Sequence, residues 1–289
     1  MAVGPRKEFT LLAALREIRR ALLAAPTATI LSQRRIVLRG EAISMSFSKR
    51  AWRRLLVASA LAFSWLPWRG PLQAQTNDAL ASALESARRT RDESQLQSLR
   101  TQLEQHLSQD ANDAQTPYQL ALVQAYLVDV YEARKDKKSA GTAVDKAIEA
   151  AQRSLQLNEK SADAHSLLAD LYGRKISLGS AMFAGPKYGP KIDQENQRAM
   201  ALDDKNPRVW ASTGRKFLMA PKMFGGDVPK GIESFQKSLS LDPSQDETWV
   251  WLAKAYQKQG DKPKAHDAIQ HALQLNPQNT FAKAIDQAK

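Results

Sequence analysis

The fold is decided by residues 246–279, which read DETWVWLAKAYQKQGDKPKAHDAIQHALQLNPQN. Large and small apolar residues recur there three and four positions apart, which is the spacing of one face of an α-helix. Two such runs follow each other, and their members are Trp249, Leu252, Ala253 and Tyr256, then Ala265, Ile269 and Ala272. Between the runs, Gly260 and Pro263 are residue types that end one helix and open the next. The stretch therefore predicts a helix–turn–helix hairpin of about 34 residues.

The hairpin resembles a tetratricopeptide repeat, whose pattern is Trp-x2-Leu-Gly-x2-Tyr followed by Ala-x3-Phe, Ala and Pro. Ala253 stands in the place of Gly and Ile269 in the place of Phe, and both keep the size class. The residues that match outright are Trp249, Leu252, Tyr256, Ala265 and Pro277. The resemblance implies an all-α fold, namely an α-solenoid of tetratricopeptide-like helical hairpins wound as a right-handed superhelix.

Weaker copies of the hairpin precede it. In residues 161–206 the motif places are taken by His165, Leu168, Ala169 and Tyr172, and in residues 207–244 by Trp210, Gly214 and Phe217. Terminal hairpins of repeat arrays are atypical because one of their faces meets water. We expect four repeats, at 116–160, 161–206, 207–244 and 245–280, with a capping helical hairpin at 75–115 and a C-terminal helical tail at 281–289.

Residues 45–74 have the three parts of a cleavable signal peptide. A positive region with Lys49 and Arg50 comes first, and a small residue, Ala74, comes last. The apolar run between them, at 55–68, has about 14 residues, whereas a membrane-spanning helix needs roughly 20. We expect export to the periplasm, with an uncleaved inner-membrane anchor as the alternative. Residues 1–44 are either a leader or an upstream stretch of a chain whose translation starts at Met45.

The charge of the chain is unevenly distributed. It has 42 Lys and Arg against 30 Asp and Glu, a formal charge of +12. Residues 1–75 hold 13 of the basic and 3 of the acidic residues, which leaves a surplus of two in residues 76–289. Nucleic-acid binding needs clustered surplus charge, so we expect no nucleic-acid partner. The absence of Cys excludes disulfides, thiolate catalysis and Cys-ligated metals.

Two neighbouring repeats carry a Met-Phe pair with Gly close behind it, in the segment between their helices. The pairs are Met182-Phe183 and Met223-Phe224. Insertions in solenoid proteins lie in loops on one face, often the binding face. In one interpretation these four side chains pack over the ends of their own helices. In the other they form an apolar lip that grips a partner, and both interpretations stay open.

A row of basic residues falls on the face of the first helices that is opposite the core: Arg174, Arg215, Lys254 and Lys258. The resemblance implies that this face is the concave, partner-binding surface. Such a row is suited to carboxylates, for instance those of an acidic peptide or a chain terminus. The alternative is a solvated surface of mixed charge, on which the row is balanced by Asp163, Asp170 and Glu247.

The sequence contains no recognisable catalytic or metal-binding constellation. His266 and His271 are five residues apart, which is not the i, i+4 spacing of a helical metal pair. Neither a phosphate-binding loop nor a nucleophile elbow occurs. We therefore expect no enzymatic activity, no cofactor and no metal.

These observations predict an exported scaffold that binds a protein or peptide on its concave face. Its contact with the membrane would be limited to the export signal. The alternative is a periplasmic accessory protein of a transporter, with a ligand cavity closed by the Met-Phe-Gly loops. The sequence does not fix the oligomeric state.

Overall fold

The computed structural model describes residues 37–38, 41–42, 71–179 and 181–287. The chain divides into two units, Met1–Gly70 and Pro71–Lys289. In the first unit, β1 (Val37–Leu38) pairs antiparallel with β2 (Glu41–Ala42). Apart from these strands and residues 71–74, the predicted leader and signal peptide lie outside the described residues, and export stays a prediction.

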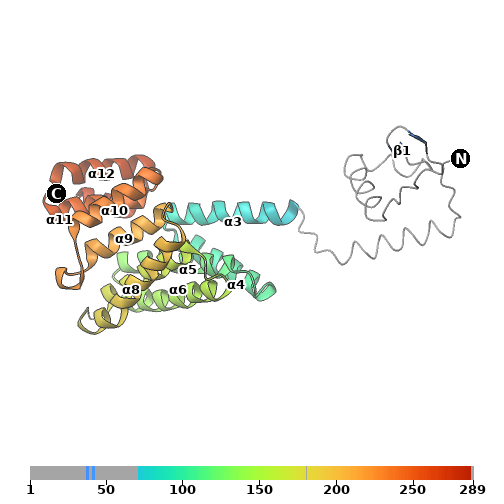
Figure 1. Cartoon of the computed structure of the whole chain (residues 1–289), viewed down its shortest axis with the longest axis horizontal. Helices are drawn as coiled ribbons and strands as arrows, with labels where there is room; N and C mark the ends of the chain where they lie inside the picture. Colours follow the sequence, from blue (N-terminus) through green and yellow to red (C-terminus); the bar gives the residue numbers. More distant parts are fainter. Residues whose placement is uncertain (1–36, 39–40, 43–70, 180, 288–289) are drawn as a thin grey trace, which may run out of the picture. The chain divides into compact units, whose positions relative to one another are not determined.

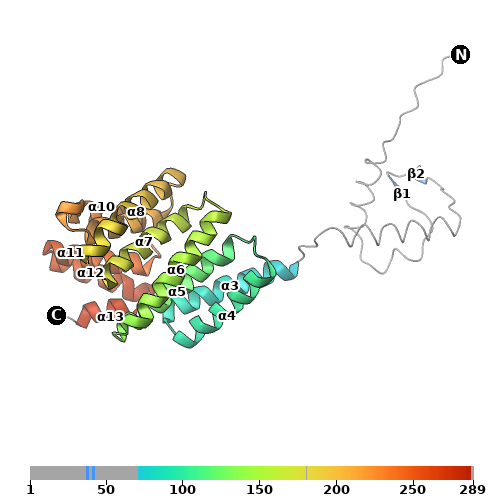
Figure 2. The same ribbon diagram turned by 90° about the horizontal axis from the view of Figure 1, so that it is seen from below.

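The second unit consists of α-helices, most of which pack as pairs that follow each other along the chain (Figure 1). Figure 2 shows these pairs arranged in chain order, from green to red. The all-α solenoid of tetratricopeptide-like hairpins is confirmed. The paired helices are α5 (Gln115–Ala133) with α6 (Lys137–Leu157), α7 (Ala162–Leu178) with α8 (Ala181–Leu202), α9 (Pro207–Met219) with α10 (Val228–Leu241), and α11 (Asp246–Gln259) with α12 (Lys262–Leu275).

Three further helices flank the pairs. α3 (Pro71–Thr90) and α4 (Glu93–Gln109) come before the first pair, and α13 (Thr280–Gln287) follows the last. α4 buries Leu96, Leu99 and Leu103 in the core that it shares with the first repeat. α3 runs without a break across residues 74 and 75, the predicted cleavage position.

Local side-chain chemistry sets the helix boundaries. Gly260 ends α11 with a φ of 92°, a left-handed conformation that costs Gly little. Helix starts are capped by side chains that accept a backbone N–H bond from the first turn. The capping residues of α6, α7, α9, α10 and α12 are Asp136, Ser161, Asn206, Asp227 and Asp261.

The first motif position makes the same hydrogen bond in three repeats. The indole Nε1 atoms of Trp210 and Trp249 donate to the carbonyl oxygen six residues earlier, at 2.7 and 3.0 Å. His165 holds this position in the second repeat, and its Nε2 lies 2.9 Å from the carbonyl oxygen of Glu159, again six residues earlier. The replacement of Trp by His therefore keeps the polar contact that ties the helix to the preceding turn.

A close approach between helices explains the glycine of the third repeat. A Cβ atom on Gly214 of α9 would lie 2.6 Å from the Cε1 atom of Phe235 on α10. In the last repeat the two motif places are held by Ala253 and the smaller Ile269, both buried. The size of the small residue on one helix thus varies inversely with that of the residue facing it: Gly faces Phe, and Ala faces Ile.

The helices of the first two repeats are longer than those of the last two. The helices α5 to α8 have 17 to 22 residues, whereas α9 to α12 have 13 or 14. We expected Met182 and Phe183 to lie between the two helices of their repeat, and this is wrong because α8 begins at Ala181 and continues through Pro186 and Pro190.

Packing explains why α8 tolerates its prolines. A proline inside a helix removes one backbone hydrogen bond and clashes with the preceding turn. Here Tyr188 and Ile192 pack against the core, and the ring of Tyr188 stacks on that of Tyr172 with a centroid distance of 5.4 Å. These tertiary contacts hold the segment in a helical conformation that its local sequence disfavours.

Candidate functional site

Charged side chains from different repeats meet on a surface formed by the first helices of the repeats. We call it the inner surface, and define it by Asp129 of α5, Asp170 and Arg174 of α7, Arg215 of α9, and Glu247, Trp251 and Lys254 of α11. The predicted basic row lies on or beside it. Whether each basic residue already has a partner within the chain decides whether it is available to a binding partner.

Both arginines of the row are already paired with carboxylates of the preceding repeat. Arg174 places Nη2 2.6 Å from Oδ1 of Asp129 and donates from Nη1 to Glu132 at 3.1 Å. Arg215 donates from Nε to Asp170 at 2.9 Å and makes a second contact with the same carboxylate. Burial opposes the charge of Arg174, but the two carboxylates outweigh this effect and raise its pKa. These guanidinium groups connect neighbouring repeats.

The two lysines of the row differ from the arginines and from each other. Lys258 donates from Nζ to the carbonyl oxygen of Leu218 at 2.6 Å. Lys254 has no carboxylate of the described residues within 4.0 Å, and its Nζ lies 4.4 Å from the ring centroid of Trp251 and 5.3 Å from that of Phe281. Burial, followed by the positive charge of Arg174, lowers the pKa of Lys254.

The C-terminal end of α3 reaches the last repeat, which the sequence did not predict. Arg88 donates from Nη1 to Oδ1 of Asp246 at 2.7 Å. The other carboxylate oxygen of Asp246 accepts from Asn276 at 2.8 Å and from Asn279 at 2.9 Å, and the residue is 1% exposed. Asn276 also donates to the carbonyl oxygen of Arg89. Helix α3 is thereby fastened to both α11 and the turn that follows α12.

Arg91, which follows α3, joins the first repeat to the last. It donates from Nε to Asp129 at 3.0 Å, pairs with Glu247, and lies over the ring of Tyr126 at 4.3 Å. Burial opposes its charge, but Glu247 and Asp129 outweigh that effect and raise its pKa. Burial would also raise the pKa of Glu247, whereas Arg91 and then Arg88 lower it to about 2. Charges of α3, α5, α7 and α11 thus form one network.

The four side chains of the proposed lip are exposed. Met182 and Phe183 lie in the first turn of α8, and Met223 and Phe224 in the short 3₁₀ helix η1 (Lys222–Phe224) between α9 and α10. Their exposed fractions are 78%, 77%, 82% and 59%. The interpretation that they pack over the ends of their own helices is therefore wrong.

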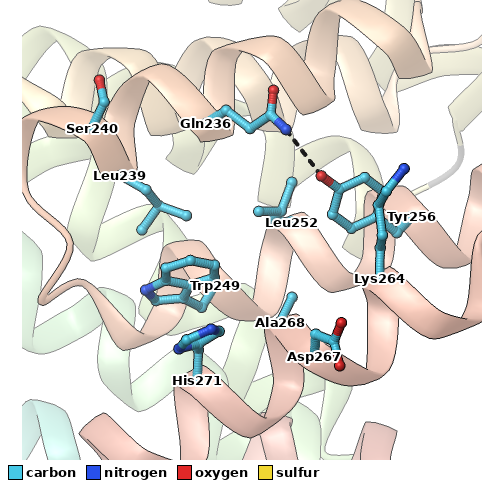
Figure 3. A pocket seen from close by; sticks show the side chains of 10 residues that line it. All are labelled: Gln236, Leu239, Ser240, Trp249, Leu252, Tyr256, Lys264, Asp267, Ala268 and His271. Carbon is cyan, nitrogen blue, oxygen red and sulfur yellow. Dashed lines mark hydrogen bonds between the residues drawn. The ribbon is translucent and has the colours of Figure 1, made fainter.

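A groove that sequence reasoning missed lies between α10 and α12, with α11 as its floor (Figure 3). Its volume is about 410 Å³. The ring of Trp249 stacks on His271 with a centroid distance of 4.5 Å, and Gln236 donates to the hydroxyl of Tyr256 at 3.0 Å. A groove of about 290 Å³ occupies the corresponding place between α4 and α6. Neither groove is lined by the lip residues, so neither supports a cavity closed by the Met-Phe-Gly segments.

The histidines of the last repeat do not approach each other. His271 stacks on Trp249, and His266 lies 3.8 Å from Asp286. Within the described ranges, no three side chains of His, Cys, Asp or Glu are placed to bind a metal ion together. None of the helices that the structure describes has both the length and the apolar character needed to span a bilayer.

The fold and the inner surface define a tetratricopeptide-type helical-repeat protein. The family described as RMD1-3, Regulator of microtubule dynamics protein 1-3, matches residues 83–288, and the chain belongs to this family. No curated protein matches the chain.

Solved structures resemble the chain in fold. TTC0263, a thermophilic tetratricopeptide-repeat protein of Thermus thermophilus, has a TM-score of 0.56 at 16% identity, covering 72% of this chain and 97% of that chain. MamA of Desulfovibrio magneticus RS-1 has a TM-score of 0.40 at 15% identity, covering 73% and 98%. At 16% identity the likeness to TTC0263 shows the shared fold alone.

Proposed function

We propose that the protein is a non-catalytic scaffold that binds a segment of a partner protein on its inner surface, with Lys254 and Trp251 as the anchor. The observation that carries this proposal is the ammonium group of Lys254. Within the described residues it is the charge of the basic row that has neither a carboxylate nor a carbonyl partner. Its pKa is lowered because burial, together with the positive charge of Arg174, outweighs the carboxylates of Asp129 and Glu132, neither of which lies within 4.0 Å of the ammonium group.

The chemistry of this anchor indicates an acidic segment. A carboxylate from a partner would supply the ion pair that Lys254 lacks, and a hydrogen bond to a charged group contributes about 1.5–3 kcal/mol. The rings of Trp251 and Phe281 lie within 5.3 Å of the same ammonium group. An apolar side chain next to the partner's carboxylate would pack against these rings, so we expect an acidic residue or a chain terminus flanked by an apolar one.

The paired arginines support a structural role for the rest of the row. Arg174 and Arg215 each bind a carboxylate of the preceding repeat, and an incoming anion would have to displace it. They set the spacing between repeats and keep the inner surface in a fixed shape. A preformed surface reduces the entropy lost on binding, which is what a scaffold requires.

A peptide-display selection against the full chain tests the proposal. We expect the selected peptides to carry a carboxylate beside an apolar residue. Their affinity should fall about tenfold or more for Lys254→Met, which removes one charge-assisted contact, and also for Trp251→Ala. The control is Lys262→Met, which removes an exposed charge at the start of α12. Selected peptides that bind wild type and Lys254→Met equally would overturn the proposal.

A further inference from the structure

The apolar lip stands out on the described surface. Among the large hydrophobic side chains that are exposed there, four of seven belong to the lip, and Met219, 57% exposed, lies at the end of α9 beside it. Large apolar patches on a soluble domain mark sites of interaction with proteins or membranes. An occupant of the lip therefore has to be identified from its shape and charge.

Both halves of the lip lie at the same edge of the stack. Met182 and Phe183 follow the C-terminal end of α7, and Met223 and Phe224 follow the C-terminal end of α9. These two helices pack against each other as first helices of consecutive repeats. Lys216 of α9 reaches Asp193 of α8 at 2.9 Å, which joins the helix that precedes one half of the lip to the helix that carries the other half.

Positive charge at this edge exceeds negative charge, since the acidic residues that directly follow the two segments of the lip, Asp193 and Asp227, are paired with Lys216 and Lys230. Residues 171–192 and 205–226, which contain the two halves of the lip, hold no Asp or Glu. Lys187, Lys191 and Lys222 are exposed there and form no ion pair with the described residues. The segments thus combine projecting apolar side chains with unmatched cations.

We propose that the lip docks on the surface of an anionic lipid bilayer. Apolar side chains flanked by lysines are the composition of segments that lie in the membrane interface, where they bury in the acyl boundary and their cations meet the headgroups. The four Met and Phe side chains project outward and line neither of the two grooves, an arrangement that suits insertion into a flat apolar layer. This surface is separate from Lys254, so the proposal stands or falls independently of the partner-binding site.

The absence of Cys allows a local test with the full chain. Phe183→Cys and Met223→Cys are each labelled with an environment-sensitive fluorophore and mixed with vesicles. We expect a blue shift with vesicles of phosphatidylcholine and phosphatidylglycerol, and little shift with phosphatidylcholine alone. The matched control is Leu202→Cys, at the opposite end of α8 and 41% exposed, which should not shift. Because the signal arises at the labelled position, binding through any other part of the chain does not imitate it.

The lysines are tested in the same assay. Removing one cation near an anionic surface should weaken binding roughly fivefold, so the combination of Lys187→Gln, Lys191→Gln and Lys222→Gln should abolish the shift at Met223→Cys. The control combination is Lys160→Gln, Lys237→Gln and Lys283→Gln, three lysines exposed elsewhere, and it should leave the shift in place.

Three outcomes would overturn the proposal. The first is no shift with any vesicle. The second is an equal shift at Leu202→Cys. The third is a shift that appears without vesicles as the protein concentration rises, which would assign the lip to contact between two copies of the chain.

Discussion

The inner surface and the apolar lip share the second and third repeats, but they differ in whether their charged groups have partners within the chain. On the inner surface the guanidinium groups of Arg174 and Arg215 bind carboxylates from another helix, as does that of Arg91 beside it. On the lip, apolar side chains project, and Lys187, Lys191 and Lys222 have no carboxylate partner in the described residues. The paired charges of the inner surface stabilise the fold, whereas the exposed groups of the lip are available to contact something outside the chain.

Lys254 fits this distinction although it lies on the inner surface. It is surrounded by matched charges, and its own ammonium group contacts aromatic rings. A residue that breaks the pattern of its surroundings is a candidate for function, because a half-buried charge without an ion-pair partner is retained at a cost in stability. Substitutions on the two surfaces should therefore differ in their effect on the free energy of unfolding.

The largest effect is expected at Asp129, which is 4% exposed and bound by Arg91 and Arg174. Asp129→Asn leaves two guanidinium groups facing a neutral amide. Breaking a buried ion pair in this way costs about 3 kcal/mol or more. Urea denaturation should show this loss in the free energy of unfolding.

An exposed ion pair provides the control for Asp129. Asp145 pairs with Lys175 at 2.7 Å and is 63% exposed. Asp145→Asn should cost less than about 1 kcal/mol, the usual range for a surface pair. If both variants lose the same stability, the inner surface has no special structural role and the contrast with the lip disappears.

Local patterns explain why the repeats were predictable. The spacing of Trp249, Leu252 and Tyr256, with Gly260 and Pro263 after them, determines a hairpin within one short stretch of chain. The start of α8 was missed because its prolines are a local signal for a break, whereas the packing of Tyr188 on Tyr172 is a tertiary one.

The candidate site was predictable in part. The four residues of the basic row lie on or beside the inner surface, and Asp170 pairs with Arg215, whereas a role of the row in partner binding stays a prediction. The partner of Arg174 was missed, although Asp129 interrupts an apolar helix between Val128 and Val130, which is the sign of a buried carboxylate. The contacts of α3 were out of reach, because Arg88 and Asp246 are 158 residues apart and no local pattern relates them.

A smaller effect is expected from acid. The pKa of Glu247 is lowered from 4.5 to about 2 in the folded protein, so its contribution to stability is present above pH 4.5 and is lost as the pH falls toward 2. The full shift would correspond to about 3 kcal/mol, but the side chain is 39% exposed and solvent screening reduces this to roughly 1 kcal/mol.

A comparison of unfolding curves at neutral and acid pH checks this contribution. Glu247→Gln should be less stable than wild type at neutral pH, and the gap should close toward pH 2. The control, Glu149→Gln, removes an exposed carboxylate of α6 that has no ion pair among the described residues and should give no such convergence. If the stability difference between Glu247→Gln and wild type stayed constant with pH, the ion pairs of Glu247 with Arg91 and Arg88 would not contribute to the free energy of unfolding.

The smallest effect on stability is expected at the lip. Met182→Ser, Phe183→Ser, Met223→Ser and Phe224→Ser should each change the free energy of unfolding by less than about 0.5 kcal/mol, because surface substitutions away from packed contacts rarely do more. The adjacent pair Leu218 and Met219 calibrates the measurement, since Leu218 is 2% and Met219 57% exposed. Leu218→Ser should cost about 3 kcal/mol and Met219→Ser almost nothing. A lip substitution that cost as much as Leu218→Ser would mean that these side chains are packed in solution, and the lip would then belong with the inner surface as part of what holds the fold together.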